Sequence, residues 1–350
     1  MLTEKQIIEI REHLEKAQNP IFFFDNDNDG LTSYLQLRRH IGRGKGIPIR
    51  SFPDLNADYF RRVKELNSDY VFILDKPVVS DEFLQQVHED NIPLVWIDHH
   101  DVEPPKQEWI NYYNPFHNDR TSEPVSYLCY KITNKKEDIW IAIIGCISDA
   151  LVPDFYEEFQ EKYPELAKDN PEKSPTGAFD VLFNSEIGKI ARILDFSLKD
   201  SITNVVKMLK FMSEAKSPYD ILEEDSRTKQ ILAKYYEINE KYQSLLKEAR
   251  SQSDNKLIFF TYGGPFSISA NLANRIKYEF PEKYVVIGFK KEGFVNISLR
   301  GINIRTITLE AIKDIPNATG GGHEMATGAR MAEEYLPQFK ENLQKLIDSQ

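Results

Sequence analysis

Three short apolar segments in the first hundred residues each end in acidic or imidazole side chains. The segments PIFFF, YVFIL and PLVWI have the composition of buried strands, and they are followed by DNDND at residues 25–29, by Asp75 and by Asp98-His99-His100. Amphipathic stretches between them favour βα units and an α/β fold whose N-terminal sheet is mainly parallel and flanked by helices. Because ligands bind outside the carboxyl ends of the strands in such a sheet, we expect these side chains to gather at one edge.

Such a concentration of carboxylates indicates a metal site. A further acid, Asp149, ends the apolar segment 139–149, whose length favours a helix. Several carboxylates at one edge repel each other and stay partly protonated unless cations neutralise them. Divalent metals remove this repulsion and lower the pKa of a bound water, so that hydroxide forms near neutral pH.

The motif DNDNDG at residues 25–30 has three interpretations. Its aspartates alternate, so in an extended backbone all three would project to one side, and Gly30 would let the chain turn into a helix opening at Leu31. An Asx-rich surface turn is the second interpretation, and an EF-hand loop is the third. The EF-hand is disfavoured because Gln36 stands where its glutamate is expected and because the motif follows a strand-like segment.

The other acidic motifs are weak when each is taken alone. Asp98-His99-His100 could be polar loop residues, Asp75 a helix-cap or turn residue and Asp149 a helix-terminal acid. Adjacent histidines at a strand end point in different directions, so one can bind a metal while the other faces a substrate. The joint order of the motifs favours the metal site.

The remainder of the chain predicts two further parts. Residues 153–175 are charged and interrupted by Pro, as in an exposed insertion, and the stretch from 186 to 252 has a helical pattern. Strands resume with KLIFFT, KYVVIGF and GFVNISLR, with a helix over Ser269–Phe280 and a final helix after ATGGGHEMATGAR. We therefore predict a metal-binding domain over 1–190, a helical connector over 191–254 and a smaller C-terminal α/β domain with a mixed sheet over 255–350.

Composition narrows the functional classes. No run approaches the ~18 apolar residues of a membrane helix, and the N-terminal segment has the pattern of an amphipathic helix rather than a signal peptide, so we expect a cytoplasmic protein without a membrane partner. The net charge of −11 disfavours a coat for long duplex DNA. A basic segment at residues 30–50 could still hold a few nucleotides. Cys129 and Cys146 are expected to be free thiols.

The order DxDxDG, Asp, DHH and a later Asp resembles that of the DHH phosphoesterase family. Gly320-Gly321-Gly322-His323 is similar to the GGGH of that family's associated C-terminal domain, and the likeness covers nearly the whole chain. DxDxDG resembles the RecJ-like branch more than the branch of nanoRNases and pAp phosphatases, whose motif usually opens with His. The chain looks like the compact two-domain form of archaeal RecJ-like proteins.

The resemblance implies two divalent metal ions, with Mn²⁺ favoured and Mg²⁺ as the alternative. One ion would be held by Asp25, Asp27 and Asp75, and the other by Asp29, Asp75, His99 and Asp149, with Asp75 bridging both. His100 would stay off the metals and stabilise phosphoryl oxygens, while Asp98 would accept a hydrogen bond from a ring nitrogen. Asp25 departs from the family pattern, because many members have His there.

In the C-terminal domain the resemblance implies a substrate-binding surface. Arg300 would clamp a phosphate or terminal nucleotide with its planar fork, and Ser298 and Asn274 are weaker candidates beside it. Three glycines would let backbone amides approach a phosphate, with His323 as a further donor. Without the resemblance, the alternative interpretation of residues 320–323 is a Gly-rich turn with a capping His. The full set of expected substrate-binding residues is Arg300, His323, Gly320, Gly321, Gly322, Ser298 and Asn274.

The function implied is that of an exonuclease releasing nucleotides from single-stranded RNA or DNA or from short oligonucleotides. One alternative is a small-molecule phosphoesterase acting on pAp or on linear or cyclic dinucleotides. Another is a replication-complex scaffold with vestigial activity, which would have a replication or repair protein as partner. The complete set of metal ligands counts against the scaffold.

Overall fold

The chain divides into two units, Met1–Ala233 and Lys234–Gln350. The computed structural model describes residues 1–50, 55–252 and 256–349. The boundary between the units falls inside the long helix α13 (Lys229–Arg250). The domain limits expected at residues 190 and 254 stay predictions, and the second of them lies outside the described residues.

The first unit contains a five-stranded sheet in the order β2-β1-β3-β4-β5, with every neighbouring pair parallel. This confirms the predicted parallel sheet, and three of its strands are the apolar segments recognised in the sequence. The two outer strands were not predicted, because β2 contains Gly and Pro and β5 is a three-residue NYY segment. The strands are β1 (Pro20–Asp25), β2 (Lys45–Ile49), β3 (Tyr70–Leu74), β4 (Leu94–Ile97) and β5 (Asn111–Tyr113).

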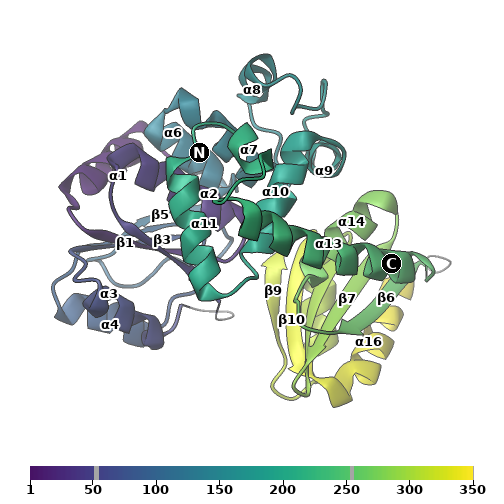
Figure 1. Cartoon of the computed structure of the whole chain (residues 1–350). Helices are drawn as coiled ribbons and strands as arrows, with labels where there is room; N and C mark the ends of the chain where they lie inside the picture. Colours follow the sequence, from purple (N-terminus) through teal and green to yellow (C-terminus); the bar gives the residue numbers. More distant parts are fainter. Residues whose placement is uncertain (51–54, 253–255, 350) are drawn as a thin grey trace. The chain divides into compact units, whose positions relative to one another are not determined.

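Helices cover both faces of this sheet (Figure 1). On one face Phe23 packs edge-on against Phe83 of α4, and on the other face Phe22 and Phe24 pack against Tyr34 of α2. The helices that surround the sheet are α1 (Glu4–Lys16), α2 (Asn28–Ile41), α3 (Phe60–Glu65), α4 (Asp81–Glu89), α5 (Phe116–Asp119) and α6 (Val125–Thr133), with 3₁₀ turns η1 (Ala57–Tyr59) and η2 (Lys136–Asp138).

The buried helix α7 (Ile139–Ser148) packs against α2 and α6. Gly145 permits this close approach, since a Cβ there would lie 2.2 Å from Oγ1 of Thr32 and 2.4 Å from Cβ of Ser126. The helix ends at Ser148 with Asp149 as its C-cap, as the length of the apolar segment predicted. This packing fixes the position of Asp149 relative to the start of α2.

The rest of the first unit is helical, as the charged pattern predicted. The segment 153–175 differs in part from an exposed insertion, because it contains α8 and buries Tyr156 and Phe159. Its Pro-interrupted charge pattern hid this small aromatic core. The helices are α8 (Tyr156–Lys162), α9 (Pro175–Asn184), α10 (Glu186–Ser197), α11 (Ile202–Glu214) and α12 (Tyr219–Leu222), and α13 follows.

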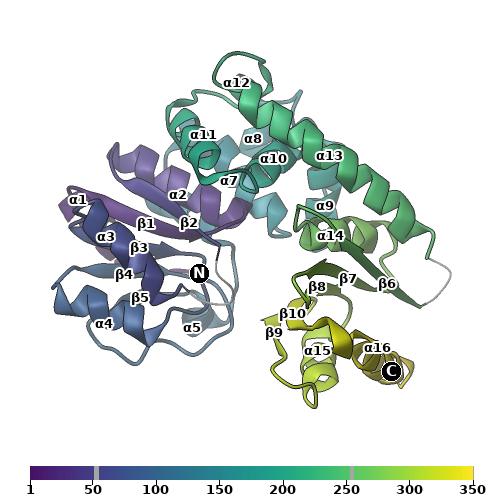
Figure 2. The same cartoon turned by 60° about the horizontal axis from the view of Figure 1, so that its bottom comes forward.

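The second unit has a mixed five-stranded sheet in the order β6-β7-β8-β10-β9, which confirms the predicted mixed sheet. Only β6 and β7 pair in parallel. Figure 2 shows α14 on one side of the sheet and α15 and α16 on the other. The strands are β6 (Leu257–Gly263), β7 (Tyr284–Lys291), β8 (Phe294–Arg300), β9 (Thr319–His323) and β10 (Ala326–Ala332). The helices are α14 (Ser269–Glu279), α15 (Ile304–Ile312) and α16 (Leu336–Asp348), with the 3₁₀ turn η3 (Glu333–Tyr335).

Among the described residues, none of the helices combines the length and apolar character that a bilayer span requires.

Candidate metal centre

The DNDNDG motif forms the junction between β1 and α2. Asp25 ends the strand, Asp27 is the N-cap of the helix, and Asp29 lies in the first helical turn. The expected extended backbone holds as far as Asp27 but not at Asp29, because the helix begins at Asn28 rather than at Leu31. The cause is capping, since Oδ1 of Asp27 accepts a hydrogen bond from the Gly30 N–H at 3.0 Å.

Backbone amides of α6 hold the carboxylate of Asp29. Its two oxygens accept hydrogen bonds from the N–H groups of Val125 and Ser126, each at 2.8 Å. These are the first two residues of α6, so unpaired N–H groups of a helix N-terminus face a buried negative charge. Each oxygen retains a lone pair that can bind a cation. The sequence held no signal for this contact between segments almost a hundred residues apart.

Asp75 follows β3 in a left-handed backbone conformation, with φ 57°. This conformation costs a residue with a side chain about 1–3 kcal/mol, and it persists where the surrounding structure fixes it. The Asp75 N–H donates to the carbonyl of Ile97, which continues the β3–β4 pairing by one residue. The side chain is buried, which holds its carboxylate at the edge of the sheet.

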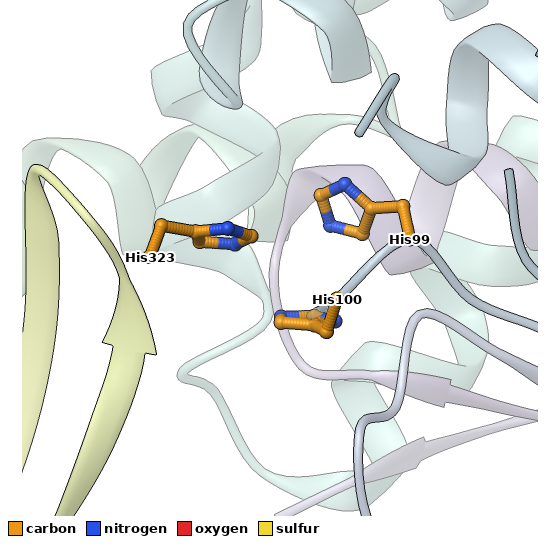
Figure 3. A group of neighbouring side chains, drawn as sticks. All are labelled: His99, His100 and His323. Atoms are coloured by element: carbon orange, nitrogen blue, oxygen red, sulfur yellow. The ribbon is translucent and has the colours of Figure 1, made fainter. Parts of the chain in front are cut away.

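His99 and His100 lie on the loop after β4 with their rings in different orientations (Figure 3). Nε2 of His99 lies 3.4 Å from Oδ1 of Asp75 and 3.8 Å from Oδ2 of Asp149. In the tautomer with a proton on Nδ1, that nitrogen donates to the carbonyl of Ser122 at 3.4 Å, which leaves the Nε2 lone pair toward the carboxylates. Ser122 was not anticipated from the sequence.

Asp98 holds the ring of His100. Nδ1 of His100 lies 2.8 Å from Oδ1 of Asp98, whose other oxygen accepts the His100 backbone N–H at 3.2 Å. Burial alone would raise the pKa of Asp98, but the His100 imidazole outweighs it and the pKa of Asp98 is lowered. Burial likewise lowers the pKa of His100, and Asp98 outweighs it, so the pKa of His100 is raised. The pair therefore favours an ionised, charge-assisted hydrogen bond.

Three groups of potential ligands from the first unit lie at this edge, and one of them, Asp75, Asp98 and His100, contains the His100–Asp98 pair described above. The other two consist of the residues that were expected to bind metal. In each group, ligand atoms from all members lie within 4.8 Å of one another. Of these two ligand groups, the first comprises Asp25, Asp27 and Asp75, and the second comprises Asp29, His99 and Asp149. Asp75 adjoins the second group through its contact with His99. The structure thus brings together all six residues that were expected to bind metal.

The electrostatics of these groups fit divalent cations. Burial, together with the carboxylates of Asp29 and Asp27, holds the pKa of Asp75 well above its ordinary value. Burial and the carboxylate of Asp149 also raise the pKa of Asp29. Burial lowers the pKa of His99, but Asp149 and Asp29 outweigh it and the pKa is raised. Protons or cations must therefore neutralise this set, and carboxylate oxygens with one imidazole suit Mn²⁺ or Mg²⁺.

In the basic segment at residues 30–50, three arginines that were expected to be able to contact nucleotides are engaged within the protein instead. Arg39 forms a buried ion pair with Asp138, at 2.6 Å. Arg43 donates to the carbonyl of Ala17, and Arg50 donates to the carbonyls of Leu198 and Asp200. These guanidinium groups join elements of the first unit to one another, which leaves the segment a weaker candidate for gripping nucleotides.

In the second unit, three expected substrate-binding residues lie on β8 and α14. Nε of Arg300 donates to Oδ1 of Asn274 at 2.6 Å, and Nη1 donates to the carbonyl of Leu299 at 2.7 Å. Asn274 therefore orients the planar fork. Ser298 is buried with its hydroxyl 3.0 Å from that of Ser269, so it is placed to support the sheet rather than to meet a substrate.

The GGGH sequence forms the edge strand β9, and His323 is its last residue (Figure 3). Gly322 has φ 133°, and a Cβ there would lie 2.6 Å from the carbonyl oxygen of Ala326, so glycine is required by the fold. Gly321 differs, because a Cβ there would meet no described atom within 4 Å. The fold does not itself require glycine at that position.

The comparisons with known proteins agree with this architecture. Residues 254–349 match the DHHA1 domain. No protein of curated function matches the chain. RecJ of Thermus thermophilus in complex with Mn²⁺ has a similar structure over 99% of this chain and 54% of its own, with a TM-score of 0.70 and 17% identity. This chain thus spans about half the length of that RecJ.

Two further solved structures are similar along most of both chains. An exonuclease RecJ bound to manganese has a TM-score of 0.62 and 18% identity, covering 98% of this chain and 94% of its own. The DHH domain of a protein assigned to a family of ribosomal proteins has a TM-score of 0.66 and 17% identity, covering 98% and 89%. At these identities the likeness shows the fold. Residues 254–349 thus match a DHHA1 domain, and the chain shares its fold with RecJ and DHH-domain proteins along nearly its whole length.

Proposed function

We propose that this protein is a phosphoesterase of the DHH/DHHA1 type, and that it acts as a two-metal exonuclease releasing nucleotides from the ends of single-stranded RNA or DNA, short oligonucleotides included. The observation that carries the proposal is the pair of adjoining ligand groups that meet at Asp75. Two divalent ions held there would supply a water of lowered pKa and positive charge for the phosphoryl oxygens. The name of one similar protein, exonuclease RecJ bound to manganese, supports the same choice.

Residues of the chain would position the metal ions, stabilise the phosphoryl group and hold the end of the substrate. Asp75 and His99 are positioned by hydrogen bonds to backbone carbonyl groups, so the ligand atoms need little reorganisation when a substrate arrives. His100, oriented by Asp98, would donate to a non-bridging phosphoryl oxygen on which charge develops. Arg300, oriented by Asn274, would hold the terminal phosphate.

Gly321 supports a phosphate-binding role for the second unit. The surrounding fold leaves room for a side chain there, yet the position carries glycine. A close approach of a ligand to the backbone is a reason for glycine that the fold alone does not give. On the outer edge of β9, backbone N–H groups could then meet a phosphate or sugar oxygen.

A substrate panel tests the proposal. Short RNA and DNA oligonucleotides, each labelled at either end, would be incubated with Mn²⁺ beside blunt duplexes, pAp and dinucleotides. We expect stepwise shortening of single strands, little cleavage of duplexes, and no reaction with excess chelator. Conversion of pAp or a dinucleotide far faster than any longer strand would replace the exonuclease by the small-molecule alternative. Absence of hydrolysis on the whole panel would favour the scaffold.

Replacing Arg300 by alanine should mainly raise KM. If the guanidinium holds the nucleotide end equally in the ground and transition states, its loss removes uniform binding and leaves kcat nearly unchanged. Asn274→Ala should give a smaller effect in the same direction, because the fork stays present but loses its orienting contact. Arg330→Ala is the matched control, since Arg330 lies over the ring of Phe294 on the same sheet. Steady-state kinetics on one oligonucleotide measure both constants. An unchanged KM for Arg300→Ala would remove Arg300 from the binding surface.

A further inference from the structure

Lys76 places a buried ammonium group beside the candidate metal centre. Its side chain is only 3% exposed, and its Nζ lies 3.0 Å from Oδ1 of Asp25. The backbone on either side is fixed, because Asp75 is left-handed and the Lys76 carbonyl accepts a hydrogen bond from Nε1 of Trp96 at 2.8 Å. Transferring an ammonium group from water to a protein interior carries a penalty of several kcal/mol, which an adjacent carboxylate can offset. Asp25 supplies such a carboxylate.

The charges at this edge balance when Lys76 is counted. Asp98 is left out of the count because it is paired with His100. Two divalent cations would bring four positive charges, and Lys76 brings a fifth. The carboxylates that remain in the two ligand groups also number five: Asp25, Asp27, Asp29, Asp75 and Asp149.

We propose that Lys76 occupies the position beside Asp25 that a metal ion would otherwise share, so that Asp25 is the counter-ion of Lys76 and not a metal ligand. The first metal position is then held by Asp27 and Asp75 alone, next to a fixed positive charge. This inference rests on the proposed two-metal function, and it revises the expectation that Asp25 binds metal.

The two metal positions therefore differ in strength. The second position is surrounded by Asp29, His99 and Asp149, with Asp75 adjoining, and it lacks a neighbouring ammonium contact among the described ion pairs. The first position has fewer ligands, and the positive charge of Lys76 repels a cation there. We expect one tightly bound ion and one weakly bound, exchangeable ion.

Equilibrium Mn²⁺ binding tests this directly, without substrate. The metal-free full chain would be titrated by calorimetry, with free Mn²⁺ followed by electron paramagnetic resonance. We expect two unequal sites in the natural protein. Lys76→Met keeps the apolar stem but removes the charge, so the weaker site should tighten by about tenfold or more. Lys136→Met is the matched control, because Lys136 forms an exposed ion pair with Glu158, and it should leave both sites unchanged.

The double variant Asp25→Asn/Lys76→Met separates a counter-ion from a ligand. If Asp25 only neutralises Lys76, replacing both by neutral side chains should leave the weaker site within a few-fold of the natural protein. If Asp25 is a ligand, the double variant should bind that ion roughly tenfold more weakly or worse, which would overturn the proposal. The double variant leaves no unpaired buried charge, so it remains informative even if a single variant fails to fold.

The outcomes also separate this inference from the proposed function. Two Mn²⁺ sites of equal affinity that is unchanged by Lys76→Met would refute the role of Lys76, while leaving the two-metal chemistry intact. A natural protein that binds no Mn²⁺ at all would refute both.

Discussion

Replacing Asp75 by asparagine should lower turnover on every substrate by about 10³-fold or more if its carboxylate bridges the two proposed metal ions, since Asp75 belongs to one ligand group and contacts His99 of the other. Asparagine is a more informative substitution than alanine at this position. It keeps the size of the side chain, and it tolerates the left-handed backbone at φ 57° that strains most residues with a Cβ. Loss of activity can then be assigned to the missing charge.

The same variant should make the metal-free protein more stable. The pKa of Asp75 is raised in the folded chain, so the folded state binds more protons than the unfolded state between the ordinary and the raised pKa. In that window the ionised group opposes folding, and its contribution becomes more unfavourable as pH rises. A neutral side chain removes this effect, so Tm without metal should rise near neutral pH, while the stabilisation by Mn²⁺ should become smaller.

Melting curves with and without Mn²⁺, together with kinetics, measure both effects. Asp154→Asn is the control, since Asp154 forms an exposed ion pair with Lys131 away from the ligand groups. If the Asp75→Asn variant retains turnover within about tenfold of the natural protein, Asp75 does not bridge two catalytic ions. A variant that is inactive and also less stable without metal would indicate a structural fault instead.

The positions of the ligand-bearing strand ends could be predicted because the signal is local. The apolar segments before Asp25, Asp75 and Asp98 are short, continuous and rich in β-branched and aromatic residues, and all three form strands. The end of α7 at Asp149 could be predicted for the same reason, from the length of one apolar run. Parallel pairing then brings these ends to one edge.

The contacts that hold the ligands could not be predicted, because they join residues far apart in the chain. The amides of Val125 and Ser126 bind Asp29 across about a hundred residues, and Ser122 meets His99 from the same segment. The sequence around Asp75 is also compatible with a helix cap or a turn, and it carries no sign that the ammonium group of Lys76 is buried beside Asp25. Alternating aspartates resemble a strand pattern, which hides the helical start at Asn28, although Asp27 is also a good helix cap.

Replacing His100 is expected to separate the chemical step from metal binding. His100 shares a group of potential ligands with Asp75 and Asp98, but its Nδ1 is hydrogen-bonded to Asp98. If that contact keeps His100 off the metals, His100→Ala should retain both ions. If it donates to a phosphoryl oxygen in the transition state, kcat should fall by about 10²–10³-fold with little change in KM. Metal content and steady-state kinetics on one oligonucleotide give these quantities. Loss of metal would make His100 a ligand.

Removing the imidazole also leaves the buried carboxylate of Asp98 without its charged partner, so a second pair of variants is needed. His100→Gln offers Asp98 a neutral amide donor, and it should fold better than His100→Ala while remaining impaired in kcat. Asp98→Asn should lower kcat when His100 is present, because the ring loses its charge-assisted contact. In the His100→Gln background the same change should have little further effect, since a residue that acts through His100 cannot act without it. Additive losses in the double variant would mean that Asp98 contributes to catalysis by a route of its own.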